Sequence, residues 1–180
     1  MMPVFPGQAM NPIVKYAGAA ALVVSGILGW RWYQAKYAPA ANFNPGWVET
    51  CSNVNFSGPP GGEPRRVGRV FVVRGAIGSP VELDSRYRPG FIDPAWYELS
   101  KPVRAVHPDE AETLVVTRRV KTADRQGVVY LRNSYRESWT VGIYDLKREI
   151  LISEVPLPFS LDAESGPAEL ARWIENLPER

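Results

Sequence analysis

The sequence has 180 residues, of which 45% are hydrophobic and 22% are charged. This composition is too apolar for a fully disordered chain and suits one domain with an appendage. Lysine and arginine total 21 against 19 aspartate and glutamate, so the overall charge gives no electrostatic reason to expect a nucleic-acid partner, which needs a basic face. Cys51 is the single cysteine, which excludes an intrachain disulfide and a thiolate-bound metal cluster.

The N-terminal region is the most apolar part of the sequence. We predict a short tail over residues 1–11 and a transmembrane anchor over residues 12–37. No charged residue occurs from Tyr16 to Trp30, and the flanking residues lengthen this core toward the roughly 30 Å of a bilayer interior. Aromatic rings stand beside cations after the core, as is typical of the headgroup level; these residues are Trp30, Arg31, Trp32, Tyr33, Lys36 and Tyr37.

Two other interpretations of this segment are open. A cleaved export signal would use the small residues at 38–40, but that site lies about ten residues beyond Leu28 and the leading segment lacks lysine and arginine. A core helix of a soluble protein would show one polar face, whereas Ser25 is the only hydroxyl side chain between Tyr16 and Trp30. We favour an uncleaved single span.

Small residues recur at every fourth position of the predicted span, which places Ala17, Ala21, Ser25 and Gly29 on one face. Small side chains let two helices approach closely in lipid, where no hydrophobic force drives them together. The pattern predicts that the span, besides contacting the lipid bilayer, packs against a protein partner or a second copy of itself.

The order of the segments suggests a location. A short tail, a span and a large C-terminal domain are typical of a signal anchor that exports its domain, although the cations beside the span favour the opposite orientation weakly. We expect a single-pass protein of the cell (inner) membrane with its soluble domain outside the cytoplasm.

Residues 38–66 are rich in proline, glycine, asparagine and serine, with the strongest interruption at 58–62. The composition predicts a linker that holds the folded part off the bilayer, in which Trp47, Val48 and Phe56 are available for local docking. The glycines lack the strand, helix and terminal Lys-Ser/Thr of a phosphate-binding loop.

Residues 67–180 predict a soluble α+β domain in which a small antiparallel β-sheet packs with a C-terminal helix. Apolar patterns predict strands over residues 67–74, 113–120, 127–132, 139–144 and 149–155. The last two strands flank a clear hairpin turn at 145–148, and residues 124–127 indicate another turn. A helix is predicted between Ser165 and Leu177, where one apolar stripe comprises Leu170, Trp173, Ile174 and Leu177.

No pattern predicts a catalytic, cofactor or metal site. His107 is the only histidine, and the following proline together with the lack of a second strong ligand favours a solvated loop that enters the strand at Thr113. Four arginines open the domain. We interpret them as a solvated strand edge, with contact to anionic headgroups as the alternative; they are Arg65, Arg66, Arg69 and Arg74.

The favoured function is non-enzymatic: a single-pass membrane-anchored protein that presents a small β-rich binding or accessory domain. The alternative is a membrane-anchored hydrolase whose carboxylates converge only in the fold. A deep pocket that gathers several of five carboxylates would favour the hydrolase; these are Asp84, Asp93, Glu98, Asp109 and Glu112.

Overall fold

The computed structural model describes residues 12–56, 62–75, 91–123 and 135–179, without the side chains of residues 12–23, 121–123 and 135–137. The chain divides into two compact units, Met1–Ala38 and Pro39–Arg180. The predicted strand over residues 127–132 and the turn before it lie outside the described residues.

The described part of the first unit is mainly one long helix, α1 (Pro12–Tyr37). Pro12 stands at its start, where the missing N–H group of proline costs no hydrogen bond. Among the residues that the structure describes, no helix is both long enough and apolar enough to cross a membrane. The transmembrane role of residues 12–37 therefore stays a prediction from the sequence.

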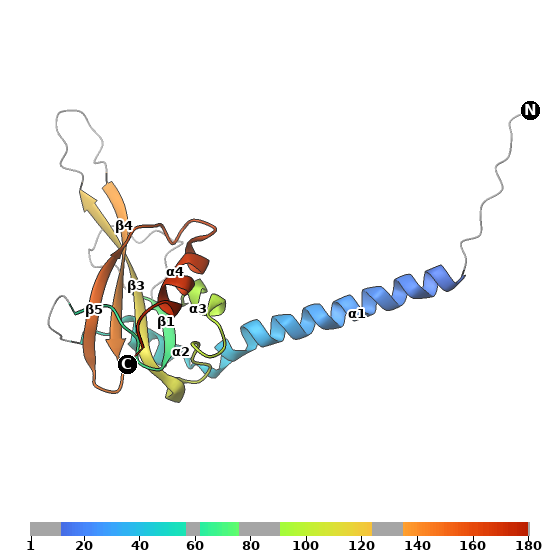
Figure 1. Cartoon of the computed structure of the whole chain (residues 1–180), viewed down its shortest axis with the longest axis horizontal. Coiled ribbons are helices and arrows are strands. Elements are labelled where there is room, and N and C mark those ends of the chain that lie inside the picture. The colour runs from blue at the N-terminus through green and yellow to red at the C-terminus, as the bar shows by residue number, and fades with distance from the viewer. Residues whose placement is uncertain (1–11, 57–61, 76–90, 124–134, 180) are drawn as a thin grey trace, which may run out of the picture. The chain divides into compact units, whose positions relative to one another are not determined.

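The second unit is an α+β fold built on a mixed sheet (Figure 1). Its described strands are β1 (Arg69–Arg74), β2 (Phe91–Ile92), β3 (Ala111–Ala123), β4 (Tyr135–Asp145) and β5 (Ile150–Leu157), in the order β2-β1-β3-β4-β5. Val70 to Val73 of β1 are completely buried, in agreement with the continuous apolar run that these four residues form within the strand predicted over residues 67–74. The strands predicted near 113–120, 139–144 and 149–155 correspond to β3, β4 and β5.

The prediction of a purely antiparallel sheet is wrong, because β1 and β3 pair in parallel, with Phe71 opposite Leu114. Parallel neighbours need a crossover of a dozen or more residues, and residues 75–110 supply it. This crossover contains β2, α3 (Pro94–Glu98) and the short 3-10 helix η2 (Pro108–Glu110). Local apolar patterns place strands along the chain, but they do not determine which strands pair or in which direction.

The C-terminal helix α4 (Gly166–Glu175) follows the prediction, with Leu170, Ile174 and Leu177 buried in the core. Helix α4 lies against α3 beside the sheet (Figure 1). Trp96 of α3 is also completely buried and donates its indole N–H to the Ala105 carbonyl oxygen at 3.0 Å. One hydrophobic core thus connects the sheet with both helices.

The linker predicted over residues 38–66 differs most from the structure. Its first part folds as the 3-10 helix η1 (Ala38–Asn42) and the helix α2 (Pro45–Ser52). Phe43, Val48 and Cys51 belong to the hydrophobic core, and the Phe43 ring stacks on Phe71 with 4.3 Å between centroids. The folded unit therefore begins at Pro39 rather than at Val67, because these apolar side chains complete one face of the sheet.

Candidate functional site

An open groove of about 810 Å³ lies beside α2 and is the candidate functional site. Its walls come from α2 with the chain that follows it to Phe56, from η2 and the start of β3, and from the turn between β4 and β5. The volume is within the range of about 300–1,000 Å³ that is common for ligand sites.

Local sequence explains the wall formed by α2. The Asn44 side chain accepts a hydrogen bond from the backbone N–H of Gly46 at 2.8 Å, and Pro45 occupies the first helical turn. An asparagine cap followed by proline is a strong helix start. The Trp47 ring then packs on Phe71 of β1, with 4.8 Å between centroids, which holds the helix against the sheet.

The segment after α2 is held in place by side chains of β3 and β4. Arg118 donates one hydrogen bond to the Val54 carbonyl oxygen at 3.2 Å and another to the Tyr144 hydroxyl oxygen at 2.9 Å. The Phe56 ring lies edge-on to the Tyr144 ring, with 6.1 Å between centroids. The groove wall from Val54 to Phe56 is thus attached to the sheet by polar and aromatic contacts.

The groove combines an apolar lining with acidic groups. Its apolar lining includes Trp47, Val54, Phe56, Leu114 and Leu146. Glu49 and Glu149 also line it, both are exposed, and neither makes an ion pair with another described residue. The groove lining described by the structure contains no lysine, arginine or histidine, so its formal charge is negative.

Cys51 lines the groove but is unsuited to nucleophilic chemistry. Its side chain is buried, and removal from water raises the pKa of the thiol to about 12. The reactive form of a cysteine is the thiolate, which this environment suppresses at neutral pH. The described residues also contain no cluster of three His, Cys, Asp or Glu side chains that could hold a metal ion.

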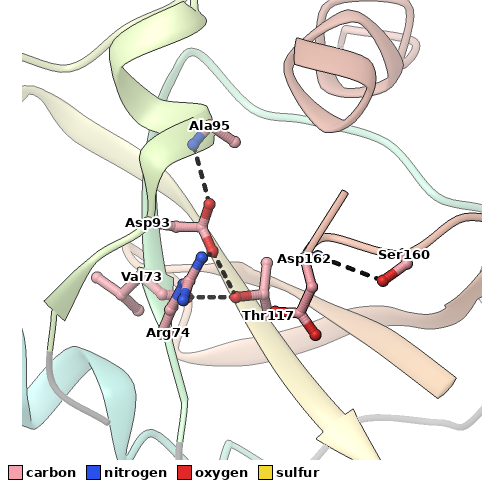
Figure 2. A network of polar contacts seen from close by, with 7 residues as sticks. All are labelled: Val73, Arg74, Asp93, Ala95, Thr117, Ser160 and Asp162. Carbon is pink, nitrogen blue, oxygen red and sulfur yellow. Dashed lines mark hydrogen bonds and ion pairs between the residues drawn. The ribbon is translucent and has the colours of Figure 1, made fainter. Parts of the chain in front are cut away.

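The carboxylates named for a hydrolase are not gathered in this groove. Asp84 lies outside the described residues, Glu98 and Asp109 are exposed, and Glu112 lines a separate cleft. Asp93 is buried in a polar network within the sheet (Figure 2). Among described residues, neither the groove nor the cleft is lined by more than one of the five.

Asp93 has a structural position. One carboxylate oxygen accepts the backbone N–H of Ala95 at 2.9 Å and so caps α3, and the other accepts the Thr117 hydroxyl at 2.9 Å. The Arg74 Nε atom lies 3.2 Å from that second oxygen. Figure 2 shows these side chains converging from β1, β3 and the start of α3.

The remaining predicted residues are placed as follows. His107 is exposed and precedes η2 at the entrance to β3, which agrees with the predicted solvated loop. Ala17 and Ala21 lie in the part of α1 whose side chains the structure does not describe, whereas Ser25 and Gly29 are described and exposed. A Cβ atom at Gly29 would meet nothing within 4 Å, and the packing face stays a prediction.

The groove is not predicted by the sequence, because the composition of residues 38–66 indicates a linker rather than the helix α2. A signal was present in Asn44-Pro45, which has the residue types of a capped helix start. The contribution of the β4–β5 turn had no sequence signal, because Leu146 lies about 90 residues from Phe56 along the chain. Comparisons with protein-family models, curated proteins and solved structures find no match to this chain.

Proposed function

We propose that this protein is a membrane-anchored binding module whose groove beside α2 holds an extended segment of a partner protein. The segment that fits has apolar side chains for the groove lining and lysine or arginine at its ends. The observation that supports this proposal is an apolar lining combined with two carboxylates, Glu49 and Glu149, that form no ion pair with another described residue. A basic apolar peptide matches both properties of the groove.

Anchoring is supported by α1. Its described apolar side chains are exposed, with exposed fractions of 54% for Val24, 61% for Leu28 and 63% for Trp30. Exposed apolar surface of this extent is typical of contact with a membrane or a partner. The proposed location is the cell (inner) membrane, with the folded unit outside the cytoplasm and the small-residue face of α1 toward a partner span or a second copy.

The alternative, a membrane-anchored hydrolase, has less support. The groove contains a neutral thiol and carboxylates, and its described lining holds no histidine or other base beside a nucleophile. The four candidate carboxylates that the structure describes are also not gathered in the groove or in the separate cleft. Binding requires only the shape and charge that the groove has.

A peptide titration tests the proposal. Isotope-labelled protein is titrated with the peptide acetyl-KLIFKL-amide and with the matched acidic peptide acetyl-ELIFEL-amide, and backbone amide shifts are followed by NMR. We expect shifts concentrated at residues 46–56, Leu114 and Leu146 with the basic peptide, and at least tenfold weaker binding of the acidic one.

Charge reversal provides the control. The double variant Glu49→Lys with Glu149→Lys is expected to reverse the preference between the two peptides. Glu164→Lys, an exposed carboxylate outside the groove lining, should leave it unchanged. Equal binding of both peptides, or shifts spread over the surface, would contradict the proposed function.

A further inference from the structure

A second hollow of about 420 Å³ lies next to the turn between β4 and β5. Charged side chains dominate its lining, with Arg65, Lys147 and Arg148 as cations and Glu112 and Asp145 as carboxylates. Three apolar side chains complete the lining: Val67, Ile150 and Ile152. We call this hollow the charged cleft; it shares no lining residue with the groove beside α2.

Both carboxylates of the charged cleft already have partners. Asp145 is buried, and one of its oxygens accepts the backbone N–H groups of Lys147 and Arg148, each at 3.0 Å. Its other oxygen lies 3.8 Å from the Arg148 Nε atom. Glu112 pairs with the Lys147 Nζ atom at 2.8 Å. The negative charge of the cleft is therefore balanced within the protein.

Arg65 is the cation without a counterpart. It is half-buried, and it makes no hydrogen bond or ion pair with any residue that the structure describes. A guanidinium group has five N–H donors, and removing such donors from water without acceptors is unfavourable. Three cations against two carboxylates also leave the charged cleft with a formal charge of +1.

We propose that the charged cleft binds a phosphodiester group, with the Arg65 guanidinium as its principal donor. A phosphodiester carries one negative charge, which neutralises the excess of the cleft, and its oxygens match the fork of donors on arginine. Arg148 and Lys147 contribute further positive charge at the rim, and Val67 and Ile150 contact the carbon substituent. The same chemistry occurs in a soluble glycerophosphodiester and in the headgroup of phosphatidylglycerol.

The test uses the full-length protein in a nonionic detergent. One arm titrates glycerophosphoglycerol by calorimetry, and the other compares mixed micelles containing phosphatidylglycerol with micelles containing diacylglycerol, which lacks the phosphodiester. Binding in the first arm supports a soluble source, binding in the second arm alone supports a lipid source, and binding in both supports the shared chemistry. Absence of binding in both arms overturns the proposal.

Matched variants separate the charged cleft from overall charge. Arg65→Gln is expected to weaken binding at least tenfold, whereas Arg172→Gln, which removes an exposed cation from α4, should have no effect. If Arg65→Gln does not fold, two other variants replace it: Arg65→Lys and Arg148→Gln. Each of these is expected to bind with intermediate affinity. Equal weakening by the Arg65 and Arg172 variants, or preference for an acidic peptide over both phosphodiesters, overturns the proposal.

Discussion

Asp93 connects three segments of the chain through one buried carboxylate. Its side chain is 1% exposed and receives hydrogen bonds from the start of α3 and from Thr117 of β3, while Arg74 of β1 supplies the compensating positive charge. A buried carboxylate is tolerated only when its oxygens are satisfied in this way. The contacts of Asp93 therefore stabilise the crossover between the parallel strands.

Replacing Asp93 tests this role. Asp93→Ala removes the cap and leaves Arg74 largely buried without its partner, so we expect a loss of about 3–5 kcal/mol in the free energy of unfolding. Asp162→Asn is the control, because the Arg119–Asp162 pair, at 3.6 Å, is half exposed on the Asp162 side and should cost less than about 1 kcal/mol. Urea unfolding followed by circular dichroism measures both; equal losses would contradict the structural role of Asp93.

Cys51 makes stability depend on alkaline pH. Burial raises its pKa from 9.0 to about 12, so the unfolded chain releases the thiol proton at a lower pH than the folded chain does. Above pH 9 the folded state therefore binds more protons, and the free energy of unfolding falls as pH rises, by up to about 1.4 kcal/mol per pH unit. Cys51→Val should remove this part of the slope between pH 9.5 and 11 in urea titrations. An unchanged slope would contradict the raised pKa.

At the scale of the elements, the same two-residue signal starts two helices, α2 and α3. Asn44-Pro45 and Asp93-Pro94 each combine a capping side chain with a proline in the first turn. No helix is predicted at either place from the sequence, because the helices that follow have only eight and five residues and show little apolar periodicity. Short helices of this kind are held by tertiary contacts, such as those of Trp47 and Trp96.

Truncation distinguishes the two parts of the N-terminal region. A protein that lacks residues 1–37 should fold, because that deletion removes α1 and leaves the core intact. Deleting residues 1–56 also removes Phe43, Val48 and Cys51 from the core, and we expect a further loss of more than about 5 kcal/mol, enough to prevent folding. Thermal unfolding followed by circular dichroism compares the two. Equal stability would show that residues 38–56 form only a linker.

At the scale of the whole molecule, the proposed anchor has a direct test. The full-length protein should remain in the membrane fraction after extraction with alkaline carbonate, whereas the protein that lacks residues 1–37 should be released, since the exposed apolar side chains of α1 are then absent. Alkaline phosphatase fused after Arg180 should be active if the folded unit lies outside the cytoplasm. Release of both proteins from the membrane fraction would contradict the anchor. An inactive alkaline phosphatase fusion on a protein that stays in the membrane would show that the folded unit lies in the cytoplasm.

The sequence alone determined what local patterns encode. Apolar runs and alternation placed β1, β3, β4 and β5, and a stripe at helical spacing placed α4, because each pattern depends on neighbours within a few residues. The turn at 145–148 was equally local. These elements were sufficient for the α+β class.

The tertiary structure alone decided the rest. Contacts between distant segments determine the parallel pairing of β1 with β3, the docking of α2 and both hollows. For example, Asn42 donates a hydrogen bond to the Val106 carbonyl oxygen, and Arg118 donates one to the Val54 carbonyl oxygen, each across 64 positions of the chain. Such contacts follow from which surfaces can be buried together, a property of the whole chain that no short window of sequence contains. The β4–β5 turn was therefore predictable from the sequence as a turn. Only the fold shows that some of its residues line the acidic groove and others line the charged cleft.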